Sequence, residues 1–168
     1  MTRRLLLLRH AKAVPDDGAG DHERALAGRG QRDAPAIGRE IARRGYRPDL
    51  ILCSTARRTA ETLDLVLPFF VPPPSTRLEP ALYHAGAALI LARASSLAAA
   101  VGTVMFVGHN PGLEELALDM AGDTRIRRRI AAKFPTAAFA AFESSAASWS
   151  DAVRGRWIAR DFLSPADL

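Results

Sequence analysis

Short stretches of consecutive apolar side chains recur along the chain and are bounded by polar residues. Three of them cover residues 5–8, 50–53 and 104–107. Apolar runs of this length are typical of strands that are buried on both faces of a parallel sheet. They predict strands over about residues 4–9, 49–53 and 103–108. We also expect extended chain over residues 76–82, and further strands over residues 136–142 and 156–162.

Between these strands the apolar positions recur at helical spacing. Ile37 and Ile41 predict the buried face of a helix over residues 28–44, which Gly45 ends. Ser54 stands where a helix N-cap belongs and predicts a helix to about residue 67. A helix rich in Ala and Leu is expected over residues 85–100, and another follows a tight turn and runs to about residue 120.

Strands that alternate with helices predict an α/β fold. We expect residues 1–168 to form a single three-layer domain, with a mostly parallel sheet, helices on both of its faces and right-handed crossovers. The last two predicted strands have no clear helix between them, which favours antiparallel pairing at one edge of the sheet. The prolines at 72–74 are interpreted as part of a loop, because the chain on both sides of them is needed for one sheet.

The composition is ordinary for a soluble globular protein, with 48% hydrophobic and 24% charged residues. Cys53 is the only cysteine, so no internal disulfide can form, and its apolar neighbours predict a buried thiol. The first apolar run is too short for a signal peptide, and no other run approaches the length of a membrane span. We therefore expect a cytoplasmic protein.

The net charge of +5 comes almost wholly from arginine, because there are only two lysines, at positions 12 and 133. Most of the arginines are expected on solvated helix faces. A dense run could instead steer an acidic partner; it comprises Arg125, Arg127, Arg128 and Arg129. Nucleic-acid binding would need aromatic residues interleaved with this run, and Phe134 is the only one nearby. We expect neither nucleic acid nor a membrane as a partner.

Two of the predicted strands end in a histidine. Arg9 and His10 follow the first apolar run, and Gly108 and His109 follow the third. Ligands bind at the carboxyl ends of parallel strands, so both imidazoles are expected at one site. A neutral imidazole can attack phosphorus, and guanidinium groups such as those of Arg9 and Arg58 can bind the charge of a phosphoryl group. The sequence contains no Walker-type glycine loop and no motif for a dedicated metal site.

The same residues lie in three motifs that resemble those of the histidine phosphatase (phosphoglycerate mutase-like) superfamily. Leu-Arg-His-Ala at 8–11 resembles its Arg-His-Gly-type motif. Residues 54–62 are similar to its second motif, a serine followed four residues later by the phosphate-binding arginine, here Arg58. Gly-His-Asn-Pro at 108–111 resembles the third. The stretch 21–30 is typical of the small SixA-type branch, the phosphohistidine phosphatases, with Arg24, Leu26, Arg29 and Gly30.

The resemblance covers nearly the whole chain and implies a phosphatase without a cofactor. The first histidine of the family becomes phosphorylated, which implies a phospho-His10 intermediate, with Arg9, Arg58 and His109 holding the phosphoryl group. The implied substrate is phosphohistidine on a partner protein. A small-molecule phosphomonoesterase, or a mutase, is the alternative among enzymes. A non-catalytic phosphoprotein-binding module is the alternative from another class.

The chain departs from the family where many members carry an acid for the leaving group. Lys12 stands where many of them have glutamate. Glu79 is the nearest positional candidate for the acid, while Tyr83 and His84 are candidates for the rim of the pocket. A site with a poor acid would favour N–P over O–P substrates, because an imidazole leaves more readily than an alkoxide. Only the span 68–82 has room to cover the site, so we expect a crevice open to a side chain of another protein.

Overall fold

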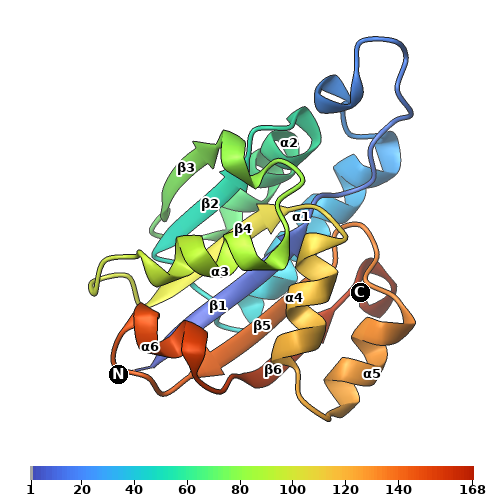
Figure 1. The fold of residues 1–168 in the computed structure, drawn as a ribbon. Helices are drawn as coiled ribbons and strands as arrows, with labels where there is room; N and C mark the ends of the chain where they lie inside the picture. Colours follow the sequence, from blue (N-terminus) through green and yellow to red (C-terminus); the bar gives the residue numbers. More distant parts are fainter. Residues whose placement is uncertain (1) are drawn as a thin grey trace.

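A six-stranded sheet forms the centre of the protein, whose computed structural model describes residues 2–168 (Figure 1). Its strand order is β3-β2-β4-β1-β5-β6. The strands are β1 (Arg3–Arg9), β2 (Leu50–Ser54), β3 (Ser75–Glu79), β4 (Thr103–Gly108), β5 (Phe139–Ser144) and β6 (Ile158–Leu163). Neighbours from β3 to β1 are parallel, whereas β5 is antiparallel to both β1 and β6. The predicted α/β fold with an antiparallel pair at one edge is confirmed, and β5 is the reversed strand.

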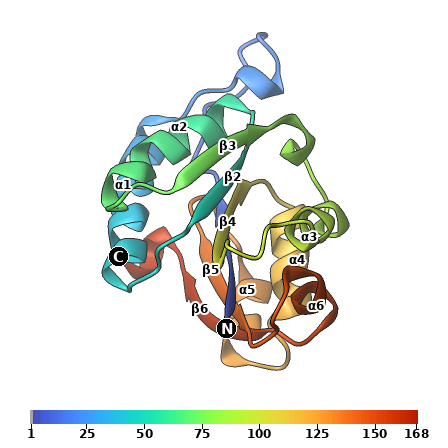
Figure 2. The same cartoon turned by 90° about the vertical axis from the view of Figure 1, so that its left-hand side faces the viewer.

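Helices cover both faces of this sheet (Figure 2). They are α1 (Gly28–Arg43), α2 (Arg57–Val66), α3 (Ala87–Ser95), α4 (Gly112–Met120), α5 (Arg125–Ala132) and α6 (Trp149–Arg154). Helices α1 and α2 share a core with Leu6 and Leu8 of β1, and the other four pack on the side of Leu5 and Leu7. Successive side chains of a strand point to opposite faces, so both faces of β1 are buried. This is why its apolar run has no polar interruption.

Helix α2 begins three residues later than the expected cap. Ser54 is the last residue of β2, and Ala56 is the N-cap of the helix. The prediction of Ser54 as a cap is therefore wrong. Its hydroxyl lies 2.8 Å from Nε2 of His109 instead, at the carboxyl edge of the sheet.

Helix α3 is also shorter than predicted and ends at Ser95. The hydroxyls of Ser95 and Ser96 donate to the carbonyls of Ala92 and Arg93. Side-chain bonds of this kind compete with the helical ladder. They end a helix that its Ala- and Leu-rich composition alone would continue.

Helices α5 and α6 were not predicted. The expectation that no helix lies between the last two strands is wrong, because α6 lies between β5 and β6. Helix α5 buries only Ile130, so its apolar pattern is weak. Both helices have an N-cap whose side chain accepts a backbone hydrogen bond, Thr124 in α5 and Ser148 in α6. These caps are the local signal by which both helices could have been found.

Cys53 is fully buried in β2, as its apolar neighbours predict. Burial raises the pKa of its thiol to about 12. Within residues 2–168, no helix has both the length and the apolar character to cross a membrane.

Candidate active site

The carboxyl ends of β1 and β4 bring the two predicted histidines together. Arg9 pairs with Gly108 in the parallel ladder between these strands, so His10 and His109 follow directly at the same edge. Their ring centroids are 5.3 Å apart. Both rings are buried, with 8% of His10 and 4% of His109 exposed. The two imidazoles therefore share one small volume, as expected for adjacent parallel strands.

The tautomer of His10 follows from its one backbone contact. Nδ1 lies 2.8 Å from the carbonyl oxygen of Ala11. A carbonyl can only accept, so Nδ1 carries the proton and Nε2 keeps its lone pair. Burial lowers the pKa of His10 to about 4, with the nearby Arg58 and Arg9 acting in the same direction. At neutral pH, His10 is a neutral imidazole with a free Nε2.

His109 has the opposite tautomer. Its Nδ1 lies 3.3 Å from Nη2 of Arg58, which can only donate, so Nδ1 accepts. Its Nε2 then carries the proton and donates to the Ser54 hydroxyl at 2.8 Å. Burial, followed by the proximity of His10 and Arg58, lowers the pKa of His109 to about 3. The lone pair that faces Arg58 is thus unprotonated at neutral pH.

Two guanidinium groups, that of the buried Arg58 and that of the half-buried Arg9, complete the predicted cluster. Arg58, in the first turn of α2, is only 3% exposed and donates through Nη1 and Nη2 to Asp21. Arg9 donates through Nη1 to the carbonyl of Phe134 at 2.9 Å. The buried Nε of each arginine has no hydrogen-bond partner within residues 2–168. A buried N–H without an acceptor is costly, so both groups favour binding an anion.

Asp21 belongs to this cluster, although the sequence analysis gave it no role. It lies in the loop before α1, which projects beyond the sheet (Figure 1). Its Oδ2 accepts from Tyr83 at 2.6 Å and from Arg58 at 3.0 Å, and its Oδ1 accepts from Arg24 at 2.9 Å. These bonds hold the pKa of Asp21 well below its usual range, Tyr83 having the largest effect. Asp21 is therefore an ionised carboxylate among cations.

Tyr83 and His84 line the other side of the cluster. Their ring centroids lie 5.5 Å and 5.1 Å from that of His109. Nε2 of His84 is 3.4 Å from Nη2 of Arg58 and 3.3 Å from Oδ2 of Asp21. The His84 side chain is 57% exposed, so it forms a border between the buried cluster and solvent.

Glu79 is placed differently from the other candidate residues. It ends β3 opposite Ser54 of β2, at the same edge of the sheet. Its carboxylate, however, accepts three hydrogen bonds from Arg93, at 2.7 to 3.0 Å. None of its side-chain hydrogen bonds in residues 2–168 reaches the two histidines or Arg58. The role of Glu79 as an acid stays a prediction, and the structure shows it as the partner of Arg93.

The arginine run in α5 is partly engaged in internal contacts. Arg127 donates to the carbonyl of Leu118. Arg129 donates to the carbonyl of Phe162 and forms an ion pair with Asp167 at 2.7 Å. These contacts join α5 to α4 and to the end of the chain. Two of the four arginines expected to steer a partner thus have a structural role.

The structure also bears on metals and on other hollows. No group of three or more His, Cys, Asp or Glu in residues 2–168 could hold a metal ion.

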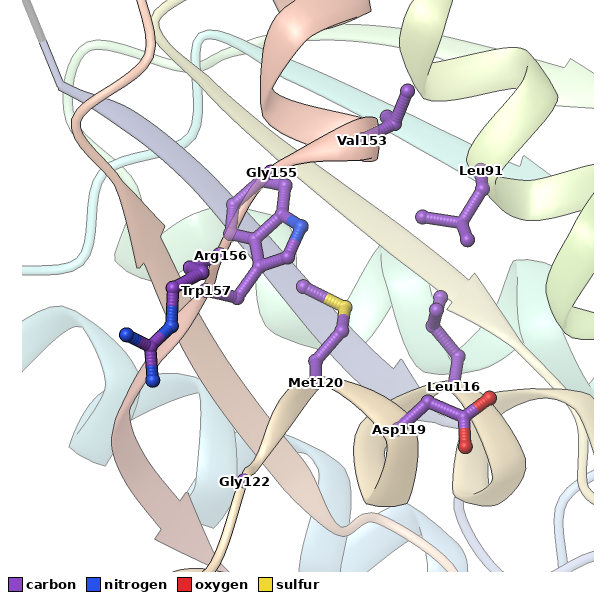
Figure 3. A pocket seen from close by; sticks show the side chains of 9 residues that line it. All are labelled: Leu91, Leu116, Asp119, Met120, Gly122, Val153, Gly155, Arg156 and Trp157. Carbon is purple, nitrogen blue, oxygen red and sulfur yellow. The ribbon is translucent and has the colours of Figure 1, made fainter.

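A hollow of about 340 Å³ lies away from the cluster, where α4 faces α3 and the end of α6 (Figure 3). It is lined by Leu91, Leu116, Asp119, Met120, Gly122, Val153, Gly155, Arg156 and Trp157. Its mostly apolar lining contains no histidine.

Comparison with known proteins identifies relatives of similar length. No family model matches the chain. An uncharacterized protein of Mycobacterium tuberculosis is 34% identical over 152 residues, which is 88% of this chain and 93% of the relative. An uncharacterized chloroplastic protein of Arabidopsis thaliana is 30% identical over 98% of this chain and 79% of its own length.

Several solved structures of named proteins share the fold of this chain. A candidate phosphohistidine phosphatase SixA from Agrobacterium tumefaciens has a TM-score of 0.83 and 33% identity, over 97% of this chain and 98% of the other. A second SixA candidate, from Nakamurella multipartitia, has a TM-score of 0.86 and 26% identity, over 98% and 97%. The fold is shared as well by a SixA structure in complex with tungstate, with a TM-score of 0.79 and 20% identity, over 98% of both chains.

Proposed function

The chain belongs to the SixA-type branch of the histidine phosphatase superfamily, and from this we propose that it is a phosphatase that removes the phosphoryl group from phosphohistidine on a partner protein. We propose His10 as the nucleophile, with Arg9, Arg58 and His109 binding the phosphoryl oxygens. The reaction proceeds through a phosphoenzyme and uses no metal. The proposal includes a cytoplasmic location, where the single buried thiol of Cys53 stays reduced.

The first step transfers the phosphoryl group to the enzyme. Nε2 of His10 attacks phosphorus in line with the leaving atom of the substrate, so an N–P bond to His10 forms while the substrate's bond to phosphorus breaks. The electron pair of that bond stays on the leaving atom. The guanidinium groups of Arg9 and Arg58 neutralise the charge on the three equatorial oxygens. In the second step water attacks phospho-His10, which releases inorganic phosphate and restores the lone pair of Nε2.

His109 has a separate part in this sequence. Its Nδ1 has an accepting lone pair at the position where Arg58 faces the cluster. An approaching phosphoryl dianion raises the pKa of an imidazole next to it. His109 can then take a proton at Nδ1 and donate it to a phosphoryl oxygen, while Nε2 stays bound to Ser54. This binding is stronger for the more charged transition state than for the free enzyme.

The observation that carries the proposal is the tautomer and the protonation state of His10. A buried imidazole whose Nδ1–H is held by the Ala11 carbonyl has its nucleophilic nitrogen free and unprotonated at neutral pH. A module that only binds phosphoprotein has no need of this arrangement. The two unpartnered Nε groups of Arg9 and Arg58 add donors for a bound phosphoryl group.

The test compares phosphate release from a phosphohistidine-bearing carrier protein with release from phosphoserine peptides and from a panel of small phosphoesters, in the presence of a chelator. We expect chelator-resistant release from the carrier, and none with His10→Ala. Comparable efficiency on phosphoserine peptides would contradict the preference for N–P bonds. Release from small esters only would favour the phosphomonoesterase alternative. No turnover of any substrate would favour the binding module.

Two neighbouring arginines provide a matched control. Arg58→Ala removes a buried guanidinium from the cluster, and we expect kcat/KM to fall by about 10²- to 10³-fold. Arg57 is exposed and paired with Glu61 one helical turn away at 2.7 Å. Arg57→Ala should therefore change kcat/KM by less than about twofold. Equal losses in the two variants would contradict a role of Arg58 in phosphate binding.

A further inference from the structure

A reaction of this kind also moves a proton, and the proposed function leaves its donor unassigned. When the bond between phosphorus and the leaving atom breaks, that atom keeps the electron pair and becomes basic. When water attacks in the second step, it must lose a proton. A side chain that gives the first proton and takes the second is worth about 10²- to 10⁴-fold in rate. It must lie next to the phosphoryl site and be open to exchange with solvent.

The ionised state of Asp21 excludes it as this donor. Its carboxylate accepts hydrogen bonds from Tyr83, Arg24 and Arg58. Each of these bonds favours the charged form, so the pKa of Asp21 lies well below its usual range. A group without a proton at neutral pH cannot donate one. Asp21 is instead placed to orient its neighbours.

His84 meets both geometric conditions. Its Nε2 lies 3.4 Å from Nη2 of Arg58, the same nitrogen that faces His109 at 3.3 Å. A phosphoryl oxygen bound to Arg58 is therefore beside the His84 ring. More than half of the His84 side chain is exposed, so the ring can exchange protons with solvent. An imidazole is also the side chain that most often serves as general acid and base, which suits a group that must both give and take a proton.

The surroundings of His84 hold its ring in this position. Its ring centroid is 4.2 Å from that of Tyr83 and 5.1 Å from that of His109. The Asp21 carboxylate at 3.3 Å stabilises an imidazolium, while the Arg58 guanidinium opposes it. Within residues 2–168, Asp21, Arg58, His109 and Tyr83 are the charged and titratable side chains in contact with the ring; they come from the loop before α1, from α2, from the end of β4 and from the segment of His84 itself. The backbone of His84 has φ 53, in the left-handed region that few residues other than Gly, Asn and Asp adopt readily.

We propose that His84 is the proton-transfer residue of this phosphatase and that Asp21 is its positioning residue. In the first step, the imidazolium of His84 donates its Nε2 proton to the leaving nitrogen or oxygen and becomes neutral. In the second step, it takes a proton from the water that attacks phospho-His10, which restores the imidazolium. Atoms and charges balance without a further reactant. This inference rests on the proposed function, because it needs the phosphoryl group at His10.

The test variant is His84→Asn. Asparagine tolerates the left-handed backbone at this position, so the loop keeps its shape, but its amide cannot transfer a proton at these pH values. The probes are phenyl phosphate, whose leaving phenolate needs a proton, and p-nitrophenyl phosphate, whose leaving group is stable without one. We measure kcat/KM for both from pH 5 to 9. A phosphohistidine-bearing carrier protein is assayed over the same range.

The expected result is a split between the two esters. His84→Asn should lose about 100-fold on phenyl phosphate and less than about threefold on p-nitrophenyl phosphate. In the wild type, kcat/KM for phenyl phosphate and for the carrier should decrease as pH rises and the imidazolium deprotonates. This decrease, the alkaline limb of the pH profile, should be absent in the variant. Asp21→Asn should keep the limb and shift it to lower pH, because the carboxylate no longer stabilises the imidazolium.

A second histidine, whose ring also contacts that of Tyr83, is the matched control. His22 is half-buried and bonds to Glu23 and to Thr55, without a hydrogen bond to Arg58 or Asp21 in residues 2–168. His22→Asn should retain the wild-type limb and the wild-type ratio between the two esters. Equal losses on both esters in His84→Asn would overturn the proposal, because they would indicate a merely structural role. A limb that is retained in His84→Asn but lost in Glu79→Gln would overturn it as well.

The two proposals fail in different ways. If His10→Ala abolishes turnover while His84→Asn has the wild-type pH profile, the proposed function stands and the role of His84 is wrong. If His10→Ala retains turnover on the carrier and on both esters, the proposed function is wrong, and the inference about His84 is wrong with it.

Discussion

The carboxylate of Asp21 lies 3.0 Å from Nη2 of Arg58, and the backbone carbonyl of Asp21 accepts a second hydrogen bond from Nη1 at 2.7 Å. The pair joins the loop before α1 to the first turn of α2, across 37 residues of sequence. The pair places the negative charge of Asp21 next to the guanidinium that we propose to bind phosphate. On this proposal Asp21 both orients Arg58 and competes with phosphate for it.

The first prediction concerns this competition. Asp21→Asn removes the negative charge and keeps an oxygen that can accept from Tyr83. We expect inorganic phosphate to inhibit the variant at about three- to tenfold lower concentration than the wild type, because the carboxylate that competes with phosphate for Arg58 is gone. We expect kcat to fall, since Arg58 and His84 are oriented less well. Inhibition constants at low and high salt measure the effect, which should shrink at high salt.

Asp17→Asn is the control for that experiment. Asp17 lies in the same loop, but among the described residues its side chain accepts only from the backbone N–H of Ala19. Its substitution should leave the phosphate inhibition constant within about twofold of the wild type, since an exposed charge is screened. Weaker phosphate inhibition in Asp21→Asn than in the wild type would show that Asp21 helps to bind phosphate.

The second prediction concerns stability in mild acid. The pKa values of His10 and His109 are lowered to about 4 and about 3, from about 6.5 in an unfolded chain. Between those values the unfolded state binds more protons than the folded state, so the free energy of unfolding falls as pH drops from about 6.5 towards 4. Above pH 6.5 both states are neutral and the two residues cause no pH dependence. For His10 the full loss is about 3 kcal/mol at most.

Urea unfolding at pH 7, 5.5 and 4.5 measures this slope. The double variant His10→Asn/His109→Gln should lose much less stability over this range than the wild type. His22→Asn, which changes an imidazole outside the buried pair, should keep the wild-type slope. Equal slopes for the wild type and the double variant would mean that the two buried rings do not resist protonation.

The third prediction compares two adjacent arginines in β1. Arg3 is only 1% exposed and donates to three backbone carbonyls, those of Ala99, Val101 and Ala147, at 2.6 to 2.8 Å. Arg3→Met leaves these acceptors without a partner, so we expect a loss of about 3 kcal/mol in the free energy of unfolding. Arg4 is 48% exposed and pairs with Glu143 at 3.5 Å. Arg4→Met should cost less than about 1 kcal/mol by the same urea measurement. Equal effects would contradict the structural role of Arg3.

The fourth prediction concerns the contact between α4 and the segment that carries Tyr83 and His84. A Cβ on Gly112 would lie 1.9 Å from the carbonyl oxygen of Ala85, which is closer than any real contact. Gly112→Ala must therefore push this segment away from α4, and we expect about 1–3 kcal/mol of destabilisation together with reduced kcat. Gly86→Ala is the control, since its Cβ would meet nothing within 4 Å. Thermal unfolding and activity of the two variants decide the question. A Gly112→Ala protein as stable and active as Gly86→Ala would contradict this packing.

The local pattern of the sequence determined the sheet and the position of the site. Apolar runs predict β1, β2 and β4 to within a residue or two, because a strand that is buried on both faces needs an apolar side chain at each consecutive position. His10 and His109 then follow at one edge, since parallel strands end on the same side of a sheet. Three motifs were enough to indicate the family, and relatives with solved structures confirm it.

Only the tertiary structure decided which polar side chains meet. Ser54 binds His109 rather than capping α2, Glu79 binds Arg93, and Asp21 joins Arg58 and Tyr83. The partners of Asp21 lie 37 and 62 residues away, and no spacing along the chain records them. Burial of an apolar side chain is a property of one residue in a local pattern, whereas an ion pair between distant loops depends on how helices and strands are placed in space. The sequence therefore indicated where the candidate site lies, and the fold determined which polar side chains surround it.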